Sequence, residues 1–530
     1  MTELSSNRPW WEGACGYQIY IRSFADSNDD GVGDLNGIRN HLGYLADLGV
    51  DFIWITPFYP SPMVDWGYDV ADYCDVDPQF GTLGDFDALL NDAHQMGMRV
   101  LVDLVPNHSS DLHPWFRNAL TGVDSNYRDY YIWADPDSDG GPPNNWIAYF
   151  GGSAWTFDKA SGQYYMHLFL PQQPDFNWRN SLLVSEFDQI LRFWLDRGVD
   201  GFRVDVAGAL IKDRYLRSNP QIGPWDLNAG RFEQWLAFEH IYDVFQPESH
   251  DIFRRWRKIV DEYDAYLFGE TYTFDPLELA RLLPGDGMHG GFWFEPMHIE
   301  WSAQEIHRAL SAPIDLLKDR LLWAAGSHDM PRSPTRFGGG DLGRERSFAL
   351  NILLAFLPGV LVLYQGEELG LVDGRVPLEA ALDPVDSGRD GCRTPMPWSV
   401  GKGNGFTTGN AWLRSDSRSD YETAQVQLTD PDSWHACYKA LLTVRKSLPS
   451  LEGFSVVWTE LEDSSVISYE RGPVGVAINT STDPNCINVP PDVEIVYSTL
   501  GTVKDHATRV TLGSHGGVIW LKASGKSNSI

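Results

Sequence analysis

Eight short apolar runs recur along this 530-residue chain, and patterns typical of helices separate them. Most of the runs are continuous rather than alternating, which indicates strands covered on both faces and therefore a parallel sheet. The runs lie at residues 16–21, 51–56, 99–104, 201–204, 266–269, 291–294, 321–326 and 360–364. Eight such runs with helices between them predict an α/β fold, a closed (β/α)₈ barrel of the TIM type.

The segment SEFDQILRFWLDRG shows the helical pattern between two runs. Its apolar side chains recur at the spacing of one helix face: Phe187, Ile190, Leu191, Trp194 and Leu195. Gly198 then stands where a helix commonly ends, because glycine adopts the left-handed backbone of a C-cap without strain. The segment directly precedes the fourth run, where a barrel requires a helix.

The distance in sequence between the third and fourth runs is too long for one crossover helix. The stretch at 108–178 is rich in Asp, Gly, Pro and aromatic residues, which predicts an inserted, irregular B subdomain over one end of the barrel. A similar stretch at 371–408 predicts a second insertion after the eighth strand. Short alternating strands near the end predict a C-terminal antiparallel β domain at 452–530. The barrel is then formed by 1–107 and 179–451.

The charge of the chain excludes several classes of partner. With 73 acidic and 41 basic residues the formal net charge is −32, which repels phosphate backbones and anionic lipid headgroups. We therefore expect neither nucleic acid nor membranes as partners. The most apolar stretch, 348–364, is shorter than a membrane span and is interrupted by Pro358 and Gly359, so it is expected to be buried in the fold.

The cysteines and the amino terminus bear on location. Five scattered cysteines without a CxxC pair argue against both a disulfide framework and a zinc site. The first residues lack the basic start and apolar run of a secretory signal. We therefore expect a cytoplasmic protein.

Polar side chains follow several of the predicted strands, at the end of a barrel where working residues gather. They are Asp103 and His108 at the third strand, Arg203 and Asp205 at the fourth, Glu270 at the fifth, and His328 and Asp329 at the seventh. Glycoside hydrolysis needs such carboxylates, because one protonates the leaving oxygen while another attacks the anomeric carbon or activates water. Arg203 would favour ionised Asp205, so Asp205 is the better nucleophile, and Glu270 in its apolar setting is the better acid.

Each of these residues alone has a simpler explanation. An aspartate at a strand end is often the N-cap of the next helix, and a histidine beside an aspartate is usually a satisfied polar pair. Asp103, before a proline turn, is expected to be structural. The placement of the whole set at strand ends is harder to explain by capping.

Four motifs occur in order at these strands: DLVPNH, GFRVD, GET and SHD. They resemble the four sequence regions of the α-amylase superfamily, glycoside hydrolase family 13, and the likeness covers nearly the whole chain. Further segments are similar to the α-glucosidase and oligo-1,6-glucosidase group: YQIYIRSFADSNDDGVGDLNGI, DWGYDVADY, QPDFNW and GRDGCRTPMPW.

The resemblance implies a retaining mechanism without an organic cofactor. Asp205 would be the nucleophile, Glu270 the acid/base and Asp329 the carboxylate that stabilises the transition state. It also implies a set of residues that hold the terminal glucose: Asp65, Tyr68, His108, Arg203, His328 and Arg393. Arg389 is close enough to Arg393 in sequence to be confused with it.

The loop DSNDDGVGD spaces its oxygen ligands like a calcium loop. The ligands would be Asp26, Asn28, Asp30, the Val32 carbonyl and Asp34. An EF-hand would also need a glutamate at the twelfth position, where Gly37 stands, and such clusters are common in surface turns. Spacing alone leaves a calcium loop and a solvated turn both open. The family resemblance implies a structural Ca²⁺ at these five residues.

Three departures from the group's pattern concern the side of the site away from the terminal glucose. Ser327 stands where the group usually has asparagine, Met330 follows the aspartate, and GETYT differs from commoner endings. Val206 is a residue type that often accompanies α-1,6 preference in this group, yet the Ala-Gly after it differs. The preference between α-1,4 and α-1,6 linkages therefore stays open.

The expected activity is removal of terminal non-reducing glucose from maltose- or isomaltose-type oligosaccharides or small α-glucosides. The alternative is a transglucosidase or an isomerising synthase of the trehalose or sucrose type, in which a sugar hydroxyl resolves the same glucosyl-enzyme intermediate. A non-catalytic binding subunit on this scaffold would be expected to have lost the carboxylates, which this chain retains.

Overall fold

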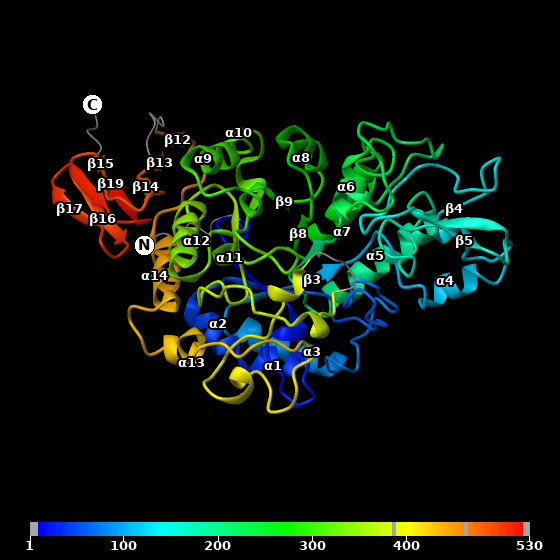
Figure 1. The fold of residues 1–530 in the computed structure, drawn as a ribbon, viewed down its shortest axis with the longest axis horizontal. Coiled ribbons are helices and arrows are strands. Elements are labelled where there is room, and N and C mark those ends of the chain that lie inside the picture. Colours follow the sequence, from blue (N-terminus) through cyan, green and yellow to red (C-terminus); the bar gives the residue numbers. More distant parts are fainter. Residues whose placement is uncertain (1–8, 384–387, 460–464, 523–530) are drawn as a thin grey trace.

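The computed structural model describes residues 9–383, 388–459 and 465–522. Eight parallel strands close into a barrel at the centre of the molecule (Figure 1). In chain order they are β1 (Cys15–Ile19), β2 (Phe52–Ile55), β3 (Arg99–Leu104), β7 (Gly201–Val204), β8 (Tyr266–Gly269), β9 (Gly290–Phe292), β10 (Leu321–Trp323) and β11 (Val360–Tyr364). Each predicted run overlaps one barrel strand, and the predicted (β/α)₈ fold is confirmed.

Helices lie between consecutive strands, most of them on the outside of the barrel. They are α1 (Leu35–Asn40), α2 (Leu42–Leu48), α3 (Leu83–Gln95), α5 (Ser181–Asp196), α6 (Arg231–Leu236), α7 (Ser249–Asp261), α8 (Pro276–Leu282), α9 (Ala303–Ser311), α10 (Ile314–Leu317), α11 (Ser333–Arg336) and α12 (Gly340–Leu354). After the barrel follow α13 (Ala424–Gln427) and α14 (Trp434–Ser447). Helix α5 begins after Asn180, whose side chain accepts a hydrogen bond from the Leu182 amide. The helix ends before Gly198, whose φ is 102°.

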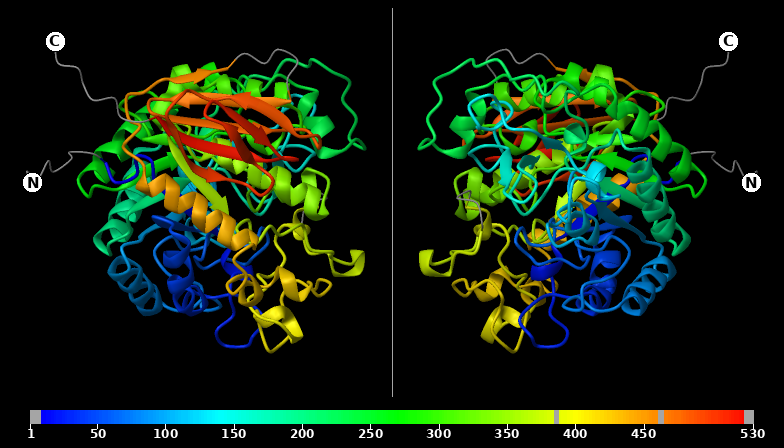
Figure 2. Two further views of the ribbon diagram at one scale, coloured as in Figure 1. Left: turned by 90° about the vertical axis from the view of Figure 1, so that its left-hand side faces the viewer. Right: turned by 90° about the vertical axis from the view of Figure 1, so that its right-hand side faces the viewer.

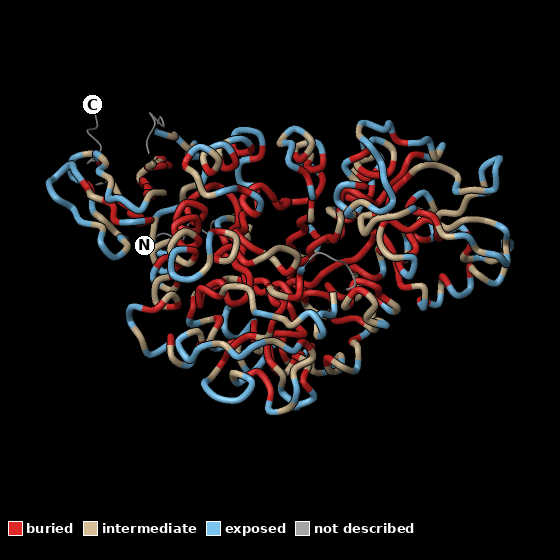
Figure 3. Tube along the Cα trace, viewed as in Figure 1, coloured by how far each residue is buried: buried red, intermediate tan, exposed pale blue. Residues whose placement is uncertain are grey.

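Alternate residues of the strands face the inside and the outside of the barrel. Phe52 and Trp54 belong to the cluster that fills the interior, together with Phe268, whereas Ile53 and Ile55 between them belong to the layer under the helices. A β-carbon at Gly16 would collide with the Phe52 ring, so a glycine in β1 makes room for this packing. Figure 3 shows buried residues concentrated around the barrel and exposed ones in the peripheral loops.

The stretch between β3 and α5 forms a small body of its own beside the barrel. It contains α4 (Pro114–Ala119) and a three-stranded antiparallel sheet of β4 (Trp133–Ala134), β5 (Trp155–Asp158) and β6 (Gln163–Met166). Buried Lys212 ties this body to the barrel, because its Nζ lies 2.6 Å from Asp175 Oδ2 in the insertion and 2.7 Å from Asn107 Oδ1 after β3.

The connection from β7 to β8 also departs from a plain barrel. Besides α7 it carries an excursion with α6 and several exposed apolar side chains, among them Tyr215, Ile222 and Leu227. The sequence predicts this stretch as part of the barrel and gives no sign of an excursion, since its apolar residues follow neither a helical nor a strand period. In the region 371–408, the described part contains short 3₁₀ turns, and residues 384–387 lie outside the described residues.

The chain ends in antiparallel sheets. One has the order β12 (Val456–Trp458), β13 (Val466–Arg471), β14 (Val474–Asn479), β19 (Gly517–Lys522) and β16 (Val493–Ser498). The other has the order β15 (Asn485–Asn488), β18 (Arg509–Leu512) and β17 (Val503–His506). Tyr469 of β13 donates a hydrogen bond of 2.6 Å to the Leu353 carbonyl of α12. The sheets therefore rest on the barrel helices, at the end of the molecule opposite the inserted sheet (Figures 1 and 2).

Parts of the predicted domains fall outside the description. Residues 1–8, 460–464 and 523–530, which belong to the predicted first and last domains, lie outside the described residues. Across the rest of the chain, no helix combines the length and the apolar character needed to cross a bilayer.

Candidate active site

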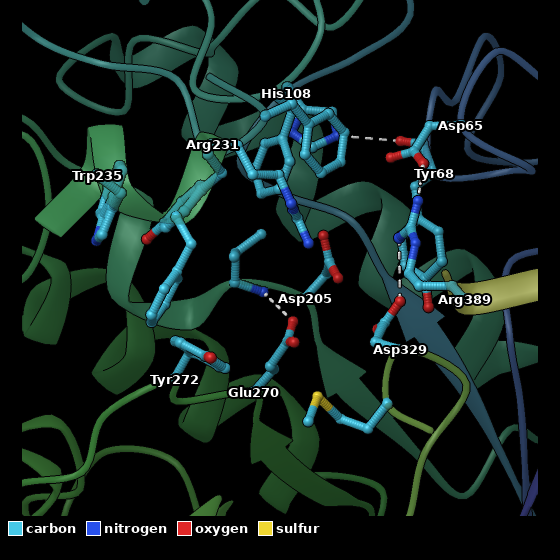
Figure 4. A pocket seen from close by; sticks show the side chains of 16 residues that line it. Asp65, Tyr68, His108, Asp205, Arg231, Trp235, Glu270, Tyr272, Asp329 and Arg389 are labelled. Carbon is cyan, nitrogen blue, oxygen red and sulfur yellow. Dashed lines mark hydrogen bonds and ion pairs between the residues drawn. The ribbon is translucent and has the colours of Figure 1, made fainter. Parts of the chain in front are cut away.

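The carboxyl ends of the barrel strands bring the predicted site residues to one cavity (Figure 4). Its volume is about 210 Å³. The lining side chains are Asp65, Tyr68, His108, Tyr149, Phe150, Phe169, Asp205, Val206, Arg231, Phe232, Trp235, Glu270, Tyr272, Asp329, Met330 and Arg389. Six of the nine predicted catalytic and glucose-binding residues are among them. Arg203 and His328 lie next to this cavity, lining a smaller one that Glu270 and Asp329 also border.

Arg203 is the centre of the carboxylate cluster. Its Nη1 lies 2.6 Å from Asp103 Oδ1 and 2.6 Å from Asp205 Oδ1, and its Nη2 lies 2.8 Å from Glu270 Oε2. The guanidinium is buried, so these pairs are formed away from water. One cation therefore holds Asp205 and Glu270 beside each other at the floor of the cavity.

The contact of one Arg203 guanidinium with three carboxylates changes the expected protonation of Asp205. Burial raises the pKa of Asp205 well above its usual range, with Arg203 acting in the opposite direction and Glu270 and Asp103 adding to the rise. We expected Arg203 to favour ionised Asp205. It does so only in part, because one guanidinium faces three carboxylates and cannot neutralise all of them. The cluster is thus suited to retain a proton, as an acid/base pair requires.

Asp329 is held by cations on the opposite side of the cavity. Its Oδ1 lies 2.7 Å from Arg393 Nη2 and 3.1 Å from Arg389 Nη1. Burial alone would raise the pKa of Asp329, but the guanidinium groups of Arg393 and Arg389 hold it below its usual range. Asp329 is therefore ionised at neutral pH. Asp205 and Glu270, in contrast, share the single positive charge of Arg203.

His328 and Tyr68 connect Asp329 to the carboxylate cluster. Burial lowers the pKa of His328 to about 3, so the imidazole is neutral. Gln18 Nε2 donates to His328 Nδ1 at 2.7 Å, which leaves the hydrogen on Nε2 to be donated to Tyr68 Oη at 2.8 Å. The Tyr68 hydroxyl then donates to Asp103 Oδ2 at 3.3 Å. These hydrogen bonds fix the orientation of the His328 and Tyr68 rings.

Asp65 and His108 form the end of the cavity near the inserted body. Asp65 Oδ2 accepts from Gln173 Nε2 at 3.0 Å, and Asp65 Oδ1 lies 3.5 Å from Arg389 Nη2. Burial raises the pKa of Asp65 to about 6, although Arg389 acts to lower it. Burial lowers the pKa of His108 to about 4, so this imidazole is also neutral at pH 7.

The structure places Arg389, rather than the expected Arg393, in the cavity wall. Arg393 lies behind Asp329 with 1% of its surface exposed, and its Nε donates to the His328 carbonyl at 2.8 Å. Arg389 comes from the 3₁₀ turn η7 (Arg389–Gly391) after β11 and reaches both Asp65 and Asp329. The direction of a side chain from such a turn was not readable from the motif GRDGCRTPMPW.

Several cavity residues were not identified from the sequence. Arg231, Phe232 and Trp235 come from α6, and Tyr149, Phe150 and Phe169 come from the inserted body. No motif marked them, although the high aromatic content of the insertion was visible. Met330 and the residues after Glu270 depart from the group's pattern, and Val206 is a residue type that often accompanies α-1,6 preference in the group. Val206, Met330 and Tyr272 all line the cavity.

The loop at 26–34 lies in the connection after β1. Asp26 accepts hydrogen bonds from the Asn28, Asp29 and Gly31 amides, at 3.0, 2.8 and 2.8 Å. Asp34 caps α1 by accepting from the Gly37 amide. Among the described residues, no group of three or more His, Cys, Asp or Glu side chains is arranged to hold a metal ion. The loop's possible ligands are all oxygen atoms, which is the chemistry that Ca²⁺ prefers.

Comparison with known proteins agrees with this arrangement. The sequence model of the α-amylase catalytic domain matches residues 18–453. A probable α-glucosidase of Rhizobium meliloti (strain 1021) is 41% identical, over 87% of this chain and 87% of its own length. An oligo-1,6-glucosidase of Heyndrickxia coagulans is 36% identical, over 83% and 85%.

A solved structure extends the likeness to three dimensions. The crystal structure of an α-glucosyl transfer enzyme superposes with a TM-score of 0.91 at 38% identity, covering 98% of this chain and 100% of that chain. The sequence match, the shared fold and the strand-end carboxylates are consistent with one another. The chain belongs to the α-amylase family.

Proposed function

We propose that this protein is a retaining, exo-acting α-glucosidase that removes single glucose units from small α-glucosides and oligosaccharides. Asp205 attacks the anomeric carbon, Glu270 protonates the departing oxygen and then activates water, and Asp329 stabilises the positive charge that develops on the sugar. The relatives named α-glucosidase and oligo-1,6-glucosidase support this reading.

The observation that carries the proposal is the position of Asp205 and Glu270. Both line one cavity, and both are within 2.8 Å of the same guanidinium. A retaining glycosidase needs its two carboxyl groups close together, because the nucleophile itself must reach the anomeric carbon while the acid reaches the oxygen attached to it. An inverting enzyme needs more separation, with room for a water molecule between carboxyl and sugar.

Paired charges at one end of the cavity support exo action. Arg389 links Asp65 and Asp329 there, at 3.5 and 3.1 Å. Their charges and hydrogen-bonding capacity suit the hydroxyls of a terminal sugar. We propose that the terminal glucose is held at this end of the cavity.

The proposal is tested by the Asp205→Asn variant assayed on isomaltose and maltose. We expect kcat to fall by roughly 10³-fold or more, because the nucleophile is removed while the shape is kept. Asp124→Asn, at an exposed position, is the matched control and is expected to keep full activity. For the wild type, NMR should show the α-anomer of glucose released first. Release of the β-anomer, or full turnover by Asp205→Asn, would refute the assignment.

A transglucosidase or isomerising synthase is the second candidate, favoured by the likeness to the α-glucosyl transfer enzyme. It would use the same residues, and a sugar or other hydroxyl would replace water in the second step. Product analysis with maltose, isomaltose, trehalose and sucrose separates the two. Free glucose as the main product supports hydrolysis, and new disaccharides support transfer.

We also propose a structural Ca²⁺ at Asp26, Asn28, Asp30, Val32 and Asp34, supported by the all-oxygen ligands and their spacing. A cytoplasmic location stays a prediction. It is supported by the five cysteines, all of them free, since secreted proteins of this kind more often carry disulfides.

A further inference from the structure

A second cavity lies between α5 and the start of the inserted body. Its volume of about 450 Å³ exceeds that of the catalytic cavity, and the two cavities share no lining residue. Three segments form its walls: the loop 71–74 after β2, residues 113–115 at the start of α4, and one face of α5 at 186–193 (Figure 1). The proposed mechanism uses none of these residues.

Four aromatic rings line this second cavity: Tyr73, His113, Trp115 and Phe193. Three of them form one wall, with the His113 centroid 4.4 Å from that of Trp115 and 5.7 Å from that of Tyr73. Phe193 comes from α5, and like Trp115 it is partly exposed, so both rings are accessible to a ligand. The faces of such rings are electron-rich and attract organic cations.

The side chains in the lining that carry a full charge are acidic. Asp72 comes from the loop after β2 and Glu186 from α5, and neither Lys nor Arg occurs among the described residues that line the cavity. The two carboxylates act on the interior of the cavity as well as on its rim. Burial raises the pKa of the Cys74 thiol to about 12, and Asp72 and Glu186 act in the same direction. The cavity therefore favours positive charge.

One arginine contacts the aromatic wall without being part of the lining. The Arg197 guanidinium lies 5.0 Å from the Phe193 ring centroid. Its charge is offset by Asp87, whose Oδ1 is 2.7 Å from Arg197 Nη1. The Phe193 ring thus already interacts with one cation, and the paired charge of Arg197 opposes a second cation only weakly.

His113 supplies a hydrogen-bond donor that no protein group uses. It is 5% exposed, and its Nδ1 accepts from the Trp115 backbone N–H at 3.1 Å, so the ring hydrogen lies on Nε2. Across the described residues this Nε2–H has no hydrogen-bond acceptor, although His113 lines the cavity. Burial lowers the pKa of His113 to about 3, so the ring is neutral and adds no positive charge. A ligand that satisfies this donor carries an acceptor oxygen.

We propose that this second cavity binds a small organic cation of the amino-alcohol type, with its nitrogen against the rings and carboxylates and its oxygen accepting from His113. A metal ion fits less well, because within the described ranges no three His, Cys, Asp or Glu side chains are arranged to hold one. A neutral sugar gains nothing from the acidic lining, whereas a cation is attracted by it and by the net charge of −32. This site is separate from the proposed α-glucosidase function, and neither requires the other.

The first test compares two ligands of the same shape on the wild-type protein. Choline and 3,3-dimethylbutan-1-ol differ in that only choline carries a positive charge. Both are titrated in a phosphate buffer of low ionic strength, and binding is followed by saturation-transfer NMR. We expect the Kd of choline to be about tenfold or more below that of the alcohol, because the charge interacts with the rings and carboxylates. Equal affinities would overturn the inference.

Charge-removing variants identify which cavity holds the cation. Glu186→Gln keeps the size of the side chain, and it should raise the Kd of choline about fivefold or more while changing that of 3,3-dimethylbutan-1-ol less than about twofold. Glu239→Gln removes the same charge at an exposed position outside the cavity and should change neither. Asp329→Asn, in the catalytic cavity, should also leave choline binding unchanged. Weaker choline binding in Asp329→Asn, with Glu186→Gln unaffected, would place the cation in the catalytic cavity and overturn the inference.

A ring-removing variant tests the aromatic wall. Phe193→Leu keeps an apolar side chain but no ring face, so the Kd of choline should rise about threefold or more. Phe157→Leu, at an exposed position of the inserted sheet outside the cavity, should leave it unchanged. Glucose binding that is tighter than choline binding, and that Glu186→Gln and Phe193→Leu both weaken, would identify a sugar site and contradict the inference.

Discussion

The backbone N–H of Val206 lies 3.0 Å from Oε2 of Glu270, so the residue after the proposed nucleophile holds the proposed acid. The same oxygen contacts Arg203. Val206 adopts φ 39° and ψ 49°, a left-handed conformation that is unusual for a β-branched residue and is typical of strained positions in functional sites. Asp205 and Glu270 are thus coupled through the backbone and through one guanidinium.

The Glu270→Gln variant tests the acid role, since glutamine can still accept the Val206 hydrogen bond but cannot supply the proton. We expect kcat/KM for isomaltose to fall by about 10² to 10⁴-fold. The loss should be much smaller for p-nitrophenyl α-glucoside, because p-nitrophenolate leaves without protonation. Glu239→Gln, exposed in the β7–β8 excursion, is the control. Losses of equal size on both substrates would argue against Glu270 as the acid.

The raised pKa of Asp65 predicts the acid limb of the pH profile. Burial raises the pKa of Asp65 to about 6, so this carboxyl is ionised above that pH and becomes protonated below it. Protonation removes its ion pair with Arg389 and weakens the hydrogen bonds it accepts from sugar hydroxyls, because a neutral carboxyl is a poorer acceptor than a carboxylate. We therefore expect kcat/KM for methyl α-glucoside to fall as the pH drops through about 6, rather than near 4 as for an ordinary aspartate. Protonation of Asp205, whose pKa burial also raises, acts in the same direction.

The Arg389→Gln variant tests whether protonation of Asp65 causes this fall of kcat/KM at acid pH. Arg389 acts to lower the pKa of Asp65, so its removal should move the acid limb to higher pH and reduce kcat/KM. A wild-type limb below about pH 5, or a limb that Arg389→Gln moves to lower pH, would show that Asp65 does not determine it.

The sequence was sufficient for the barrel and for the carboxylates because both depend on strands. Parallel strands buried on both faces leave continuous apolar runs, and the ends of neighbouring strands must meet at one edge of a barrel. Asp205, Glu270 and Asp329 each follow a strand closely, so their convergence could be predicted. That Arg203 contacts three carboxylates at once depends on side-chain directions inside the barrel, which the sequence does not contain.

The rest of the site lies on irregular segments, and fewer of its cavity-lining side chains could be predicted from the sequence. Arg389 and Arg393 are four residues apart on a turn, and which of them faces the cavity depends on the backbone of that turn. Phe232 and Trp235 belong to a short helix in a long excursion without a regular period. Lys212 follows β7 like an ordinary surface lysine, yet it is buried because the inserted body covers it.

Lys212 is predicted to be essential for joining the inserted body to the barrel. Burial lowers its pKa, while Asp175 at 2.6 Å favours the charged form. Lys212→Met would leave Asp175 buried without a counter-charge, and we expect a loss of about 3–5 kcal/mol in the free energy of unfolding, measured by urea denaturation. Lys439→Met, which breaks the exposed pair with Asp47, should cost at most about 1 kcal/mol.

A double variant identifies the cause of that loss. Adding Asp175→Asn to Lys212→Met removes the uncompensated charge, so part of the stability should return. If the single variant were as stable as the Lys439→Met control, the buried pair would not be what holds the insertion.

Calcium at the loop 26–34 is tested by thermal unfolding. If Ca²⁺ binds the folded protein there, a chelator should lower the unfolding midpoint by a few degrees, and added CaCl₂, but not MgCl₂, should restore it. Asp30→Asn should weaken this dependence, because Asp30 is exposed and its loss removes a ligand charge without opening the core. Asp139→Asn, in an exposed turn of the insertion, should keep the full response. A midpoint that neither the chelator nor calcium moves would show that the loop is a solvated turn, held by the Asp26 and Asp34 hydrogen bonds alone.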